Sequence, residues 1–501
     1  WVAYHRGRTV TTLESVSRLA LTVVHCHNPA CSRFERPYRP EEEGAWALPH
    51  HEFGLDVIAL IGTLRYREHR SVPEIHQALR ERQVTIAERT VTYLLERYEE
   101  LLALCLADQT RLKDCLTQQG HVILAIDGLQ PHKHQDVLWV LRDCLSGDVL
   151  LARSLDSGRE ADLSDMLREV TTWLPVPIHA VISDGQRTIR LAVQKVLPGI
   201  PHQLCQYQYL KEASKPILDA DRHAKTELKK YVRGVREVER KVAKREDPEA
   251  DVVRSYCLAV RSSLSDEGKP PLQLPGVLMH DRLTAIVASL ERVQQKGGLQ
   301  PELVELQNVV GRGLFATASL WAPLQTAQNW LVQVARVLAN EEWADGATVE
   351  RAYRGVLAEV LTHQGDGAVG AWATEFYKVT RSYWRGLFHC YDLPDVPRTN
   401  NDLEHYFGTA RHQERRATGQ KRPTSAVAVR GSVRVVAAVA ARQRRWSGQE
   451  LRPSDIAAWY KLRAAMEVRH EARRQRRRFR RDPQTYLAAL EARLLRPGLP
   501  V

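Results

Sequence analysis

The sequence contains few cysteines for its length and no long apolar run. Its eight cysteines are scattered through 501 residues, whereas a disulfide framework needs a high density of cysteines in a short secreted chain. We therefore expect reduced cysteines, as in a cytosolic protein. A helix that spans a bilayer needs about 20 consecutive apolar residues, and no segment of this sequence reaches that length. These absences exclude a disulfide scaffold and predict that the chain has no membrane segment.

Acidic residues are also in the minority. The 72 Lys and Arg residues outnumber the 60 Asp and Glu residues, which gives a net charge of +12 and a pI near 9.3. Neutralisation of phosphates by Lys and Arg is the main sequence-independent source of affinity for nucleic acids. The charge balance therefore favours a polyanionic partner, with a merely solvated basic surface as the alternative.

The length predicts about two to four domains rather than one simple core. Hydrophobic periodicity divides the chain into six segments. These are a small loop-rich module (1–52), a first helical region (53–115), a region of strands and helices (116–210), a long helical region (211–392), a further helix (393–440) and a basic helical end (441–501). The predicted fold class is α/β plus all-α.

The first segment contains two cysteines and several histidines in a short stretch. Cys26 and Cys31, together with His50 and His51, could supply four tetrahedral ligands to Zn²⁺. Small modules of this kind often fold around a metal in place of a core. The spacing is irregular and no second cysteine pair is present, so two reduced cysteines and surface histidines remain the alternative.

The second segment has the pattern of a helix-turn-helix. Two short helices are predicted at 71–79 and 87–95; Ser71 and Glu74 form a capping box, and Pro73 suits a first helical turn. In such a motif the second helix enters the major groove of DNA, and its candidate contacts are Arg89, Thr90, Thr92 and Tyr93. The alternative is a helical hairpin used for packing or dimerisation, which the apolar seam from Tyr93 to Leu102 would serve.

Two aspartates end predicted strands in the third segment. Strands are expected at 121–127, 137–142, 149–154, 178–183 and 202–205, with helices at 160–173 and 186–196. Asp127 ends the first of these strands and Asp184 follows the fourth, and a glycine comes after each aspartate. Carboxylates gathered in this way bind hard divalent cations such as Mg²⁺ and Mn²⁺.

A third acidic residue lies in Thr399-Asn-Asn-Asp-Leu-Glu404-His-Tyr-Phe407. The helix start Thr-Asn-Asn-x-x-Glu, with the two strand-end aspartates before it, resembles the DDE transposases of bacterial insertion sequences. We expect Thr399 or an adjacent asparagine to cap this helix and Glu404 to lie in its first turns. The alternatives are that Asp402 takes the acidic role, or that Glu404 is a surface charge near a helix N-terminus.

The resemblance implies a fold, a cofactor and a set of partners. It implies an RNase H-like catalytic domain interrupted by a large helical insertion, similar to those of Mutator-like and hAT-like transposases. Asp127 would then bridge two Mg²⁺ or Mn²⁺ ions, Asp184 would bind one of them and Glu404 the other. The implied partners are double-stranded DNA, both element ends and target, and further copies of the chain in a dimer or larger assembly. The implied location is the bacterial-type cytoplasm, at the nucleoid.

Cationic segments follow the third acidic residue. Phosphate contacts are expected there, with a solvated loop or helix face, or a disordered tail, as alternatives. The candidate contacts are His405, Arg411, Arg415, Arg416, Lys421, Arg422, Arg473, Arg474, Arg476 and Arg477.

Tryptophans are frequent in the predicted insertion. The resembled families use an aromatic side chain there to stack on a flipped base. Trp321 and Trp330 have polar neighbours and are our candidates for that role, although tryptophans at helical spacing are more often core residues. The leading hypothesis is thus a transposase that binds terminal inverted repeats, cleaves DNA and transfers strands; the alternatives are an RNase H-like nuclease without strand transfer and a domesticated DNA-binding regulator.

Overall fold

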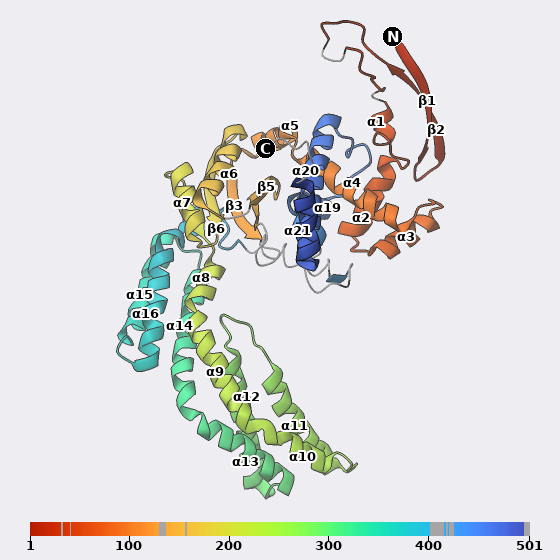
Figure 1. Cartoon of the computed structure of the whole chain (residues 1–501). Coiled ribbons are helices and arrows are strands. Elements are labelled where there is room, and N and C mark those ends of the chain that lie inside the picture. The colour runs from red at the N-terminus through yellow and green to blue at the C-terminus, as the bar shows by residue number, and fades with distance from the viewer. Residues whose placement is uncertain are drawn as a thin grey trace. The chain divides into compact units, whose positions relative to one another are not determined.

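The computed structural model describes residues 1–31, 34–40, 42–129, 137–155, 158–400, 415–416, 419 and 425–494 (Figure 1). The protein is mixed α/β and mostly helical, as the sequence predicts. It divides into two compact units. The first comprises residues 1–181, 187–200 and 400–501, and the second comprises residues 182–186 and 201–399.

The chain begins with a β-hairpin that the sequence does not reveal. Strand β1 (Val2–Thr11) pairs antiparallel with β2 (Val16–Val24), where the sequence predicts a loop-rich module. Most side chains on both strands are exposed, so the usual alternation of apolar and polar residues is missing. The hairpin is tied to helix α1 (Glu43–Trp46) through Arg8, which pairs with the buried Glu43.

Four helices follow, and the predicted helix-turn-helix pattern falls on two of them. They are α2 (Leu55–Tyr66), α3 (Val72–Glu81), α4 (Glu88–Leu106) and α5 (Gln109–Gln119). The capping box is confirmed: the Ser71 side chain accepts from the Glu74 N–H, and the Glu74 side chain accepts from the Ser71 N–H. Helix α4 is longer than predicted because its second half is buried.

The helices at the two ends of the sequence share one hydrophobic core. Buried residues of α2, α3 and α4 form a single cluster with residues of α19 (Ser425–Gln443) and α20 (Ile456–Arg481). Tyr98, Ala437 and Trp459 are fully buried in this cluster. A last helix, α21 (Pro483–Leu494), follows α20. The predicted apolar seam of α4 is thus a packing surface within the chain.

The central part of the first unit carries a five-stranded sheet. Its elements in chain order are β3 (Val122–Leu129), β4 (Val137–Asp143), β5 (Val149–Leu155), α6 (Glu160–Trp173), β6 (Ile178–Ser183), α7 (Arg187–Val196) and β7 (His202–Leu204). The strand order is β5-β4-β3-β6-β7, and β3 is the central strand. The pairs β3/β4 and β4/β5 are antiparallel. The predicted strands are confirmed, with ends that differ by one or two residues.

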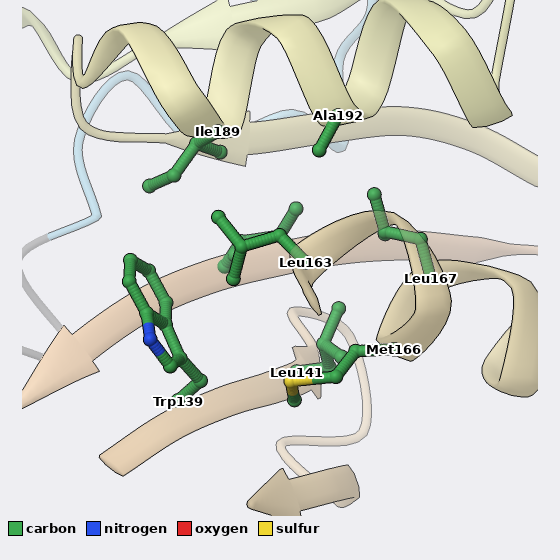
Figure 2. Close-up of a pocket in the computed structure, with 8 residues that line it drawn as sticks. Trp139, Leu141, Leu163, Met166, Leu167, Ile189 and Ala192 are labelled. Carbon is green, nitrogen blue, oxygen red and sulfur yellow. The ribbon is translucent and has the colours of Figure 1, made fainter. Parts of the chain in front are cut away.

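One face of this sheet packs against α6 and α7. Figure 2 shows Trp139 and Leu141 of β4 facing Leu163, Met166 and Leu167 of α6, with Ile189 and Ala192 of α7 completing the layer. All of these side chains are buried. Helices packed in this way fix the sheet and therefore the position of Asp127 on it.

The second unit is built from helices, as predicted for residues 211–392. They are α8 (Gln206–Ala213), α9 (Lys215–Tyr231), α10 (Val235–Val242), α11 (Pro248–Ser265), α12 (Pro275–Gly297), α13 (Pro301–Ala316), α14 (Trp321–Ala339), α15 (Gly346–Thr362), α16 (Gly367–Tyr383) and α17 (His389–Asp392). One continuous cluster of buried residues runs through them. At its centre the buried hydroxyls of Tyr209, Tyr353 and Thr380 bond to one another. Within the described parts of the chain, no helix is both long and apolar enough to cross a membrane.

Candidate functional site

Asp127 lies on the central strand of the sheet, in a position set by its neighbours. It is 9% exposed, and its Oδ1 accepts from the N–H of Gly128 at 2.8 Å. In the β3/β4 register Gly128 lies opposite Trp139, and a Cβ atom at Gly128 would come within 3.0 Å of the Trp139 ring. The glycine after the aspartate is therefore required by the tryptophan on the next strand.

Asn400 connects the start of the Thr-Asn-Asn motif to the strand that carries Asp127. Its side-chain Nδ2 donates to the carbonyl of Ile126 at 3.1 Å, and the residue is 7% exposed. The sequence suggests a helix cap for Thr399 or a neighbouring asparagine, and the structure adds a bond to β3. Two segments separated by 274 residues thus meet one residue before Asp127.

Asp184 directly follows β6, in a turn that leads into α7. Its Oδ1 accepts from the N–H of Gln186 at 3.1 Å, and it is half-buried. A Cβ atom at Gly185 would lie 1.9 Å from the Tyr383 hydroxyl. Only glycine fits this turn, so each of the two Asp-Gly pairs has its glycine fixed by an aromatic side chain.

The described residues leave the acidic triad untested. Glu404, its rival Asp402, and His405, Arg411, Lys421 and Arg422 lie outside them. Arg415 and Arg416 are described and exposed. Within the described ranges, no group of three His, Cys, Asp or Glu side chains is arranged to hold a metal ion. The carboxylate oxygens of Asp127 and Asp184 are hard donors and are chemically suited to Mg²⁺.

The candidate zinc ligands are not gathered in the described structure. Cys26 lies in a tight loop, where its Sγ accepts from the N–H of Asn28 at 3.4 Å, and Cys31 is half-buried nearby in sequence. His51 is buried: its Nδ1 donates to the Pro49 carbonyl at 2.9 Å, and its ring stacks on Tyr93. No three of Cys26, Cys31, His50 and His51 form a ligand group, and zinc binding stays a prediction.

The environment of His51 suppresses its charge. Burial, the largest cause, together with nearby Arg97 and Arg463 lowers the pKa of His51 to about 4, against the smaller opposing effect of its bond to Pro49. The ring is therefore neutral at neutral pH.

The first turns of α4 expose part of the predicted DNA-reading surface. Arg89 and Thr92 are exposed and Thr90 is half-buried. Tyr93 is 40% exposed, yet its ring packs on His51 and lies 4.6 Å from the Arg97 guanidinium. Arg89 and Thr92 are thus the better placed of the four to contact another molecule.

The arginine tract forms the end of helix α20, so it is not a disordered tail. Arg473 is half-buried, whereas Arg474, Arg476 and Arg477 are exposed. Arg474 pairs with Glu467 at 3.0 Å and with Glu471 at 3.3 Å. Burial first, and Arg477 second, lower the pKa of Arg473. The tract is a dense cationic face.

The two tryptophans favoured for base stacking lie in the core of the second unit. Trp321 is 2% exposed and Trp330 is 1% exposed, and the Trp321 Nε1 donates to the Thr317 hydroxyl. The alternative left open by the sequence, core packing, describes both. Trp343, in the turn between α14 and α15, is 93% exposed and has a φ of 56°. Sequence reasoning passed over it, although the neighbouring polar residues of the turn could have marked it.

Comparison with models of known protein families gives no match, and no curated protein matches the sequence.

Proposed function

We propose that the protein is a DDE-type DNA transposase with an RNase H-like catalytic domain. The observation that carries the proposal is the strand order β5-β4-β3-β6-β7, in which Asp127 lies on the central strand and Asp184 follows its neighbour β6. Three strands, a helix, a strand, a helix and a strand, with acidic residues at these two positions, are the arrangement that the resemblance implies. The bond from Asn400 to Ile126 supports a role for the motif that contains Glu404.

The proposed chemistry needs two Mg²⁺ or Mn²⁺ ions held by Asp127, Asp184 and Glu404. When bound, such ions stabilise a pentacovalent phosphate and activate the attacking oxygen. The chain supplies the carboxylates and their positions. Clustered carboxylates repel one another, which explains why the site would depend on cations.

The proposed DNA contacts lie on three surfaces. Arg89 and Thr92 on α4 would contact element ends, and Arg415, Arg416 and the arginines of α20 would neutralise phosphates. Trp343 replaces Trp321 and Trp330 as the candidate for stacking on an unpaired base, because only an exposed ring can do so.

The test is a strand-transfer assay with a labelled repeat end, a target plasmid and Mg²⁺ or Mn²⁺. Joined products support the proposal, cleavage alone indicates a nuclease, and binding alone indicates a regulator. Asp127→Asn, Asp184→Asn and Glu404→Gln should each abolish catalysis and leave end binding largely intact. Asp165→Asn, an exposed position on α6, is the matched control and should retain activity. Activity retained by any of the three variants would remove that residue from the site.

A further inference from the structure

A cavity in the first unit has a cationic lining that the proposed chemistry does not use. It encloses about 850 Å³ of empty space between α4, α19 and α20 and is open to solvent on one side. Arg97 from α4 and Arg463 and His470 from α20 contribute cationic or protonatable groups to its wall, and Tyr460 adds a phenol.

Arg97 is the central group of this cavity. The residue is only 4% exposed. Its Nη2 is 3.0 Å from Glu100 and 3.5 Å from Glu96, but its Nε and Nη1 are buried with no hydrogen-bond partner among the described residues. Buried donors are nearly always paired, since leaving a charged donor unpaired is costly. Arg97 therefore has two N–H groups directed at a missing acceptor.

The carboxylates nearby already have partners. Glu100 accepts from Arg430 at 3.2 Å and from the Trp459 Nε1 at 3.0 Å, in addition to its pair with Arg97. Glu467 pairs with Arg474 at 3.0 Å. None of these side chains satisfies the two orphaned donors of Arg97.

A second guanidinium on the wall lacks an acidic partner. Arg463 lies 4.9 Å from the Trp459 ring and donates to the Tyr93 hydroxyl at 3.5 Å, and no ion pair joins it to a carboxylate in the described parts of the chain. Burial, the largest cause, lowers the pKa of Arg97, and Arg463 and Arg430 lower it further against the opposing effects of Glu100 and Tyr93. An anion in the cavity would relieve this repulsion.

We propose that this cavity binds a phosphate group, with Arg97 and Arg463 as its principal ligands and His470 at its edge. A phosphate offers several acceptor oxygens to guanidinium donors that converge from two helices, which a single carboxylate does not. The group has two conceivable sources: a backbone phosphodiester of bound DNA, which rests on the proposed function, or free phosphate or a small phosphate ester, which does not.

The first arm of the test is thermal unfolding of the full chain in inorganic phosphate and in chloride at equal ionic strength. Phosphate should raise the unfolding temperature of the wild type in a saturable manner. Arg97→Met and Arg463→Gln should weaken phosphate binding by at least about tenfold, because each removes a charge-assisted hydrogen-bond donor. Lys461→Gln, an exposed cation on the same helix, is the matched control and should bind phosphate as the wild type does.

The second arm measures the salt dependence of duplex DNA binding by the same variants. A backbone source reduces the slope of log K against log[salt] by about one in Arg463→Gln relative to Lys461→Gln. An unchanged slope with a lost phosphate effect identifies free phosphate as the source. Arg463 is half-buried at the cavity mouth, so its variant tests the site even if Arg97→Met does not fold. A phosphate effect kept by both variants, or no phosphate effect together with unchanged slopes, would overturn the proposal.

Discussion

Gly185 shows how one residue beside a candidate catalytic carboxylate is fixed by packing. A Cβ atom there would lie 1.9 Å from the hydroxyl and 2.0 Å from the ring carbon of Tyr383. The turn that presents Asp184 therefore has room for a hydrogen only.

We predict that Gly185→Ala destabilises the protein by about 1–3 kcal/mol, the usual range for forced overpacking. Urea unfolding measures the change. The matched control is Gly311→Ala on α13, where a Cβ meets nothing within 4 Å; it should be neutral or slightly stabilising, since alanine favours helices. Equal effects of the two substitutions would contradict the packing account.

His51 makes stability depend on pH. Its pKa is about 4 in the folded protein and near 6.5 when exposed, so folding favours the neutral ring. This contribution is complete above about pH 6.5 and is lost as pH falls toward 4, by up to about 3 kcal/mol.

We therefore predict that His51→Leu flattens the loss of unfolding free energy between pH 6.5 and 4. Denaturant unfolding at a series of pH values measures it. The exposed His223 provides the control, and His223→Gln should keep the wild-type profile. An unaltered profile in His51→Leu would show that other groups cause the acid sensitivity.

At the scale of elements, buried charges join helices from opposite ends of the sequence. Arg430 of α19 is 2% exposed; its Nε donates to Glu99 at 2.7 Å and its Nη1 to Glu100 at 3.2 Å, both on α4. Tyr66 of α2 also donates to Glu99. The helix that follows the Glu404 segment is thus bonded to the long helix of the helix-turn-helix pattern.

Removing one member of this network should leave buried charges unpaired. We predict that Arg430→Met costs about 3–5 kcal/mol of unfolding free energy. Arg168→Met, which breaks an exposed pair with Asp165 on α6, should cost less than about 1 kcal/mol. Adding Glu99→Gln to Arg430→Met should cost less than the sum of the single changes; strict additivity would argue against a coupled network.

Two tryptophans of the second unit test the difference between a core element and a surface turn. Trp330→Ala should destabilise the protein by about 3–5 kcal/mol because it leaves a cavity. Trp343→Ala should leave stability unchanged and weaken binding to DNA with an unpaired base by about 1–3 kcal/mol, the value of one base-aromatic stack. Calorimetry and fluorescence anisotropy measure the two effects. Unchanged DNA binding by Trp343→Ala would remove it from the proposed contacts.

At the scale of the whole molecule, the proposed metal ligands come from three distant segments of the chain. A ligand that binds only the folded state stabilises it, by about 2.7 kcal/mol at 100 times its dissociation constant. We predict that Mg²⁺ raises the unfolding temperature of the wild type and of Asp165→Asn but not that of Asp127→Asn. A Mg²⁺ effect kept by Asp127→Asn would place the cation elsewhere.

The sequence was sufficient for features that depend on local pattern. The apolar runs before Asp127 and Asp184, the Ser71–Glu74 capping box and the helical periodicity of residues 211–392 all predicted elements that the structure contains. Period and capping are properties of neighbours in the chain. They also placed both aspartates at strand positions. The acidic triad itself remains a prediction, since Glu404 lies outside the described residues.

Tertiary structure decided what depends on contacts between distant residues. The exposed hairpin at residues 2–24 carries no apolar alternation, so its pairing had no sequence signal. Burial separates Trp321 and Trp330 from the exposed Trp343 only once the helices pack. The orphaned donors of Arg97 exist because α4, α19 and α20 converge. The residue types are written in the sequence, but their exposure and their missing partners arise only from packing.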